Sequence, residues 1–208
     1  MTGLRRPLSR ELVLKTALRL ADRHGTQAMS MRKLGAALGV EAMSIYHHVR
    51  SREDLLDGLA EIMVRDELPV PKPSDPWEEA LRDFLVGIRH TALRHPAAFE
   101  LVGLRPLRSP AALAPVEALL LCLHQGGLTP NEAVAAYRTG TAYARGFALA
   151  ELVGLTLADR RGPVTIPPTL AAFVPALTGD SAEIFHRGIE LIIGGIRQSL
   201  SEEKVPEG

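Results

Sequence analysis

The sequence predicts an all-α protein, and three observations support this prediction. Signals for helix starts recur along the chain. Strand signals are nearly missing, because only 4% of the residues are aromatic and no run alternates apolar and polar side chains. A proline-rich segment over 68–74 separates a unit of short helices from a larger bundle, and we expect about nine or ten helices in all.

The first unit opens with a helix that begins after the capping residue Ser9. Its apolar side chains repeat on one face to about His24. Ser30 then precedes a short helix over 31–38, and Gly39 is expected to end that helix in the left-handed conformation.

A second short helix is expected over 42–48, directly after the glycine turn. Two short helices joined by such a turn are typical of a helix-turn-helix, so the first unit is expected to hold a three-helix domain of that kind. Ser51, with Asp54 three residues later, resembles a capping box for a longer helix that runs to about Glu67.

The larger bundle follows the linker, and a cap residue followed by proline marks several of its helix starts. Thr129 with Glu132, and Asp180 with Glu183, have the spacing of capping boxes. The helices are expected over 75–95, 96–103, 109–125, 129–157 and 180–200, with a loop over 158–168.

Charge is distributed unevenly along the 208 residues. The whole chain has 24 Lys and Arg against 24 Asp and Glu, which argues against a histone-like binder of nucleic acid. Residues 1–52 nevertheless carry a net charge of +7 and residues 53–208 carry −7. This asymmetry suggests that the basic part meets a polyanion, although a chance surface distribution would give the same counts.

The remaining composition argues against several classes of protein. Cys122 is the only cysteine and lies in an apolar run, so we expect a buried, inert thiol. The sequence shows no signal peptide and no apolar run long enough for a bilayer, so we expect a cytoplasmic protein without a membrane partner. It also shows no hydrolase, metalloprotease, phosphate-loop or dinucleotide fingerprint, so we expect neither an enzyme nor a cofactor or metal site.

One stretch is much more specific than the general pattern. Residues 30–56 read SMRKLGAALGVEAMSIYHHVRSREDLL. This string resembles the DNA-binding signature of the TetR family of transcriptional regulators, and the resemblance covers residues 9–67. The departures are mild: Gly35, Ile45 and Arg52 stand where the family usually has alanine, leucine and lysine.

The rest of the chain resembles the C-terminal domain of the tetracycline-repressor type. The matching features are Trp77 and the segments 103–106, 122–126 and 188–196. The resemblance implies three parts: a helix-turn-helix DNA-binding domain over 1–52, a connecting helix over 53–67, and an effector-binding and dimerisation domain over 75–208.

The resemblance implies that the second short helix enters the major groove of a double-stranded DNA operator. Arg32 matches a position that often reads guanine, and Tyr46, His48 and Arg52 match positions that usually touch phosphate. The expected DNA-binding residues are Ser30, Arg32, Ala42, Met43, Ser44, Tyr46, His47, His48 and Arg52. Alternatively, Tyr46 is a core aromatic and His48 an ordinary surface residue.

An N-terminal basic arm precedes this domain and contains Arg5, Arg6 and Arg10. We expect the arm to add phosphate or minor-groove contacts, and the alternative is a solvated tail.

The resemblance also implies a homodimer through the helices near 129–157 and 180–200, where Gly194 and Gly195 allow another helix to approach closely. A two-fold dimer would present two reading helices to a near-palindromic operator. The alternative is that these helices form only the core of one subunit.

Regulators of this family leave DNA when a small molecule shifts the C-terminal domain. The tetracycline repressor binds its drug with magnesium through a histidine and a threonine, but Leu101 and Leu104 stand in those places here, and Phe84 replaces an amide. We therefore expect an unknown, largely apolar small-molecule effector, with Arg105, Tyr137 or Arg138 as polar anchors. The expected lining residues are Phe84, Ile88, Leu101, Leu104, Arg105, Pro106, Val134, Tyr137 and Thr141.

Two alternatives to a ligand-released repressor stay open. In the first, the lining residues are plain core packing and a protein partner controls the regulator. In the second, the chain is an activator, since activation or repression depends on where the operator lies relative to the promoter.

Overall fold

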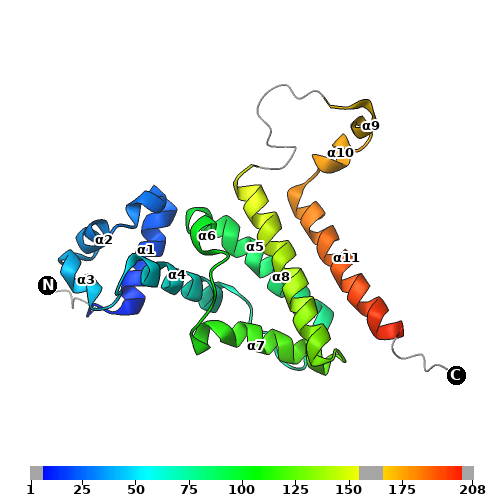
Figure 1. The fold of residues 1–208 in the computed structure, drawn as a ribbon, viewed down its shortest axis with the longest axis horizontal. Coiled ribbons are helices and arrows are strands. Elements are labelled where there is room, and N and C mark those ends of the chain that lie inside the picture. Colours follow the sequence, from blue (N-terminus) through cyan, green and yellow to red (C-terminus); the bar gives the residue numbers. More distant parts are fainter. Residues whose placement is uncertain (1–6, 155–165, 203–208) are drawn as a thin grey trace, which may run out of the picture. The chain divides into compact units, whose positions relative to one another are not determined.

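The structure is a computed structural model that describes residues 7–154 and 166–202 (Figure 1). These residues form eleven α-helices and one 3-10 turn, and no strand occurs among them. The prediction of an all-α protein is confirmed. None of the helices within these two ranges combines the length and apolar character that crossing a membrane requires.

The described residues form two compact units. The first contains the residues up to Glu67 together with Arg94–Leu113, and the second contains Leu68–Leu93 together with the residues from Ala114 onward. The helices of the first unit are α1 (Arg10–His24), η1 (Thr26–Ala28), α2 (Met31–Leu38), α3 (Ala42–Tyr46), α4 (Arg52–Glu67) and α6 (Pro96–Val102).

Local capping explains where the first helices begin. The Ser9 Oγ accepts a hydrogen bond from Leu12 N at 3.2 Å, and the Ser30 Oγ accepts one from Lys33 N at 3.3 Å. These bonds satisfy amides that the helix itself leaves without partners. Packing then holds the unit together, since Leu34, Ile45, Val13, Leu55 and Leu59 have no exposed surface.

Helix α6 belongs to the first unit because it packs against α1 and α4. Its N-cap residue His95 is 7% exposed and lies between two carboxylates. The His95 Nδ1 is 3.0 Å from Asp22 Oδ2 of α1, and the Nε2 is 3.5 Å from Glu67 Oε1 of α4. The sequence predicts that 94–113 belongs to the effector-binding and dimerisation domain. The contacts of His95 instead tie the start of this segment to α1 and α4.

The second unit contains most or all of α5 (Trp77–Arg94), α7 (Pro110–Gln125), α8 (Pro130–Leu152), α9 (Pro168–Ala171), α10 (Val174–Leu177) and α11 (Ser181–Glu202). The capping box at Thr129 and Glu132 is formed as predicted. Helices α8 and α11 run antiparallel side by side (Figure 1).

An aromatic cluster joins α8 to α11. The rings of Tyr143 and Phe185 stack with centroids 5.5 Å apart, and Phe147 lies 5.2 Å from Phe185. The guanidinium of Arg89 lies 5.4 Å from the centroid of the Phe185 ring. Arg89 also makes two hydrogen bonds to Glu151, at 2.8 and 2.6 Å, so α5 is tied to both long helices.

The ends of two helices and one further segment differ from the prediction. Helix α3 ends at Tyr46 rather than at 48. Helix α8 ends at Leu152, because Gly154 has a φ of 65° and closes it, while the predicted end at 157 lies outside the described residues. Two short helices, α9 and α10, occupy 168–177, where the sequence analysis expected only the end of a loop at 168.

Candidate nucleic-acid interface and ligand site

The turn between α2 and α3 has the geometry of a helix-turn-helix. Gly39 adopts the left-handed conformation with a φ of 68°, and its N–H donates to the Ala36 carbonyl at 3.3 Å. Val40 N donates to the Gly35 carbonyl at 3.0 Å, so both amides after α2 are satisfied. Ile45 is fully buried, so the opposite side of α3 faces outward.

The outward face of α3 is apolar and aromatic. Met43 is 69% exposed and Tyr46 is 43% exposed, and His47 just beyond the helix is also exposed. Ala42 and Ser44 are half-buried. Because Tyr46 lies at the surface, it is not a core aromatic, and its phosphate contact stays a prediction.

Polar and basic residues surround this face. Ser30, Arg32 and Arg52 are exposed, at the N-termini of α2 and α4. The free amides of such N-termini favour an anion, and an exposed guanidinium suits either phosphate or a guanine edge. His48 is half-buried, and its backbone carbonyl is already used inside the protein.

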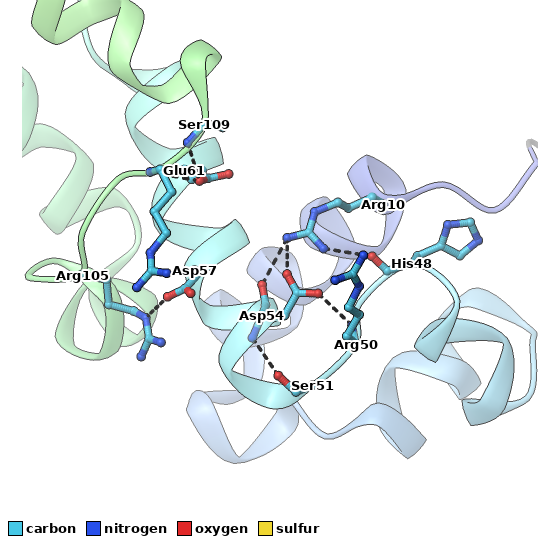
Figure 2. Close-up of polar contacts among 10 residues, drawn as sticks. Arg10, His48, Arg50, Ser51, Asp54, Asp57, Glu61, Arg105 and Ser109 are labelled. Atoms are coloured by element: carbon cyan, nitrogen blue, oxygen red, sulfur yellow. Dashed lines mark hydrogen bonds and ion pairs between the residues drawn. The ribbon is translucent and has the colours of Figure 1, made fainter.

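The residue that uses the His48 carbonyl is Arg10, which was expected to belong to the basic arm (Figure 2). Its Nη1 donates to His48 O at 2.9 Å, and its Nη2 donates to Asp54 Oδ1 at 2.6 Å. The pKa of Asp54 is lowered, chiefly because Arg10 donates to the charged carboxylate.

Asp54 does not complete the predicted capping box. Its amide does donate to Ser51 Oγ at 3.1 Å, but its carboxylate accepts from Arg50 N at 2.8 Å rather than from Ser51 N. Arg10 is 44 residues away from Asp54, so no spacing in the sequence could have revealed this pair.

The expected ligand-lining residues divide between the two units. Phe84, Ile88 and Thr141 are buried in the second unit, and the ring of Phe84 meets that of Tyr137 edge-on at 6.3 Å. The Thr141 hydroxyl donates to the Tyr137 carbonyl at 2.8 Å, so it is satisfied by its own helix. Val134 is 44% exposed.

The other four expected residues lie in the first unit, at or just after the end of α6. Leu101 is half-buried, and Leu104 and Pro106 are exposed. Arg105 is not free, because its Nε donates to Asp57 Oδ1 at 2.7 Å (Figure 2). Its Nη2 also donates to Glu53 Oε2 at 2.6 Å. These carboxylates raise the pKa of Arg105, and a pocket shared by all nine residues stays a prediction.

Residues of α8 and α11 line a groove of about 330 Å³. Its lining includes Leu128, Ala136, Ile192 and Ile196, and Leu191, which also lines it, is 74% exposed. A side chain at Gly194 or Gly195 would meet open space, so another helix could approach here. Within the described ranges, no three His, Cys, Asp or Glu residues are arranged to hold a metal ion.

Two family models match the chain. The model described as bacterial regulatory proteins, tetR family, matches residues 13–59, and the model of the tetracyclin repressor-like C-terminal domain matches residues 70–200. The first match covers the helix-turn-helix and the first half of α4, and the second covers nearly all of the rest.

Individual relatives agree with these matches. An HTH-type transcriptional regulator of Saccharopolyspora erythraea is 33% identical over 207 residues, covering 94% of this chain and 87% of the relative. The tetracycline repressor protein class E of Escherichia coli is 28% identical, covering 95% of this chain and 94% of the relative.

Solved structures match over the same length. Apo ActR of Streptomyces coelicolor has a TM-score of 0.83 at 28% identity, covering 95% of this chain and 99% of that chain. ActR in complex with actinorhodin has a TM-score of 0.77 at 26% identity, covering 94% and 99%. The chain belongs to the TetR family of bacterial transcriptional regulators, which bind DNA through the helix-turn-helix.

Proposed function

We propose that the chain is a transcriptional repressor that binds a near-palindromic operator as a homodimer and leaves it when a small, largely apolar effector binds. The observation that carries the DNA-binding part is the outward face of α3. Buried Ile45 and the Gly39 turn position that face, and Arg32 and Arg52 are exposed at the N-termini of α2 and α4. A chromosome-bound repressor acts in the cytoplasm.

The groove on α8 and α11 supports the homodimer. Its lining is apolar, and Leu191 has 74% of its surface exposed in the single chain. Such a patch on paired helices suits burial against the same patch of a second copy. Two recognition helices related by a two-fold axis require two half-sites, which makes the operator near-palindromic.

The relatives support a small-molecule effector. The structural neighbour ActR was solved in complex with actinorhodin, and several relatives are tetracycline repressors. In this chain Leu101 and Leu104 offer no ligand for a magnesium ion. We therefore propose an effector that is held mainly by apolar contacts, like a polycyclic aromatic compound, and not a metal chelate.

Binding to DNA is tested by fluorescence anisotropy with duplexes tiled over the DNA upstream of the gene. We expect one near-palindromic duplex to bind far more tightly than the others, with an affinity that falls steeply as salt rises. Arg52→Gln should weaken binding and reduce its salt dependence. The control is Arg108→Gln, which removes another exposed arginine and should change neither. Absence of binding to any upstream duplex at low salt would contradict the proposal.

The dimer and the effector need separate measurements. Light scattering should give twice the mass of the 22.5 kDa chain, and Leu191→Glu should reduce it to the monomer. Actinorhodin is a suitable first probe, and we expect it to raise the melting temperature and release DNA, whereas tetracycline with Mg²⁺ should do neither. Tight DNA binding that no polycyclic aromatic probe releases would favour control by a protein partner.

A further inference from the structure

Arg10 is the first residue of α1, and its guanidinium contacts the protein at His48 and Asp54 although 40% of its side chain stays exposed (Figure 2). Besides its bonds to His48 O and Asp54 Oδ1, its Nη2 lies 3.3 Å from the Asp54 carbonyl. Three acceptors on two segments are therefore held by one planar group, whose fork geometry suits such multiple contacts.

These acceptors lie at the two ends of the segment that connects α3 to α4. His48 follows α3 by two residues, and Asp54 is in the first turn of α4. The Asp54 carboxylate also accepts from Arg50 N at 2.8 Å, so the backbone between the two helices is held at His48 and at Arg50. Val49 between them is fully buried.

We propose that Arg10 is a positioning residue for DNA reading and not a phosphate ligand. It fixes the C-terminal end of α3 through the His48 carbonyl and Asp54, so that His47 keeps one orientation toward the base edges and Tyr46 one orientation toward phosphate. This inference rests on the proposed DNA binding. It deepens that proposal, because it separates a residue that sets sequence specificity from the exposed arginines that supply affinity.

Specificity and salt dependence distinguish the two roles. A phosphate ligand contributes equally to every DNA sequence and to the number of counterions released, so its loss lowers the salt slope by about one for each contact. A positioning residue leaves the slope unchanged, and its loss weakens only the complex that depends on exact base contacts.

The experiment measures the dissociation constants of the full-length dimer for the operator duplex and for a scrambled duplex, at several salt concentrations. The variants are Arg10→Gln, Asp54→Asn, the double variant, and Arg52→Gln as the phosphate control. We expect Arg10→Gln and Asp54→Asn each to weaken operator binding about tenfold, with little change for scrambled DNA and an unchanged salt slope. The double variant should be no weaker than either single variant.

The opposite pattern would overturn the proposal. If Arg10 binds phosphate, Arg10→Gln will lower the salt slope as Arg52→Gln does and weaken both duplexes equally. Asp54→Asn, which removes a competing carboxylate, will then leave binding unchanged or tighten it. Should Arg10→Gln fail to fold, Arg10→Lys keeps the charge without the fork and should still lose operator specificity at an unchanged slope.

Hydrogen exchange tests the geometry even if no operator is found, and such a failure would count against the proposed function rather than against this inference. In the wild-type protein the Arg50 amide should exchange slowly, because Asp54 accepts its hydrogen bond. Arg10→Gln should speed exchange over 47–50 relative to Arg108→Gln. Unchanged exchange over 47–50 would show that Arg10 does not stabilise the segment between α3 and α4.

Discussion

Arg105 and Asp57 join the loop after α6 to the middle of α4. The Arg105 Nε donates to Asp57 Oδ1 at 2.7 Å, while Glu61, one helical turn further on, accepts from Ser109 N at 2.9 Å. Glu53, Asp57 and Glu61 are spaced four residues apart, so they share one face of α4. All three carboxylates are bound to the loop over 105–109, so this acidic face sets where the loop lies.

The two ion pairs of Arg105 should differ in strength. The Asp57 side chain is 27% exposed, whereas that of Glu53 is 68% exposed and well screened by water. We expect Asp57→Asn to lower the free energy of unfolding by about 1 kcal/mol and Glu53→Gln by a few tenths at most. Urea denaturation checks this, and an equal or larger loss for Glu53→Gln would contradict it.

Local signals in the sequence predicted most helix starts. Ser9, Ser30 and Thr129 cap their helices as expected, and Gly39 ends α2 in the left-handed conformation. Cys122 is buried, as its apolar neighbours indicated. These features could be predicted because each depends on atoms within a few residues.

Features that depend on distant parts of the chain could not be predicted. The partners of Arg10 lie 38 and 44 residues away, and those of Arg105 lie 48 and 52 residues away. The sequence marked both arginines as functional and assigned them to DNA and to the effector, because an arginine shows its charge in the sequence but not its partner. The end of α3 at Tyr46 was missed as well, and the bond from Arg10 to the His48 carbonyl just beyond it was equally invisible in the sequence.

Gly35 marks the closest approach of α2 to the turn before α3. A Cβ there would lie 2.7 Å from the Val40 carbonyl oxygen and 3.2 Å from Ala42 N, both of which are backbone atoms. An alanine side chain would therefore not fit here unless the turn moved. Gly35→Ala gains helix propensity but forces the turn apart, and we expect a net loss of about 1–2 kcal/mol.

The control for that substitution is Ala36→Ser, on the exposed side of the same helix. It should change the free energy of unfolding by no more than about 0.5 kcal/mol. Thermal and urea denaturation of both variants give the comparison. An unchanged or more stable Gly35→Ala protein would mean that the turn widens without cost.

Two arginines of α5 pair with glutamates in different surroundings. Arg89 and Glu151 are 15% and 18% exposed, and Arg82 and Glu190 are 30% and 54% exposed. Lysine cannot reproduce the two-pronged contact or the position over the Phe185 ring. Arg89→Lys should therefore cost about 1–3 kcal/mol, and Arg82→Lys less than about 0.5 kcal/mol, in urea denaturation. Similar losses for both would show that burial does not decide the strength of these pairs.

Asp54 should make stability depend on pH in the acidic range. Its pKa in the folded protein is lowered, first by the hydrogen bond from Arg10, so the charged form is favoured by folding. The resulting stabilisation is complete above the unfolded-state pKa of about 4 and is lost as the pH falls through the lower folded-state value. In urea denaturation, the stability difference between wild type and Asp54→Asn should be constant from about pH 7 to 5 and shrink below about pH 4. A difference that stays constant to pH 3 would show that the Arg10 contact does not depend on the charge of Asp54.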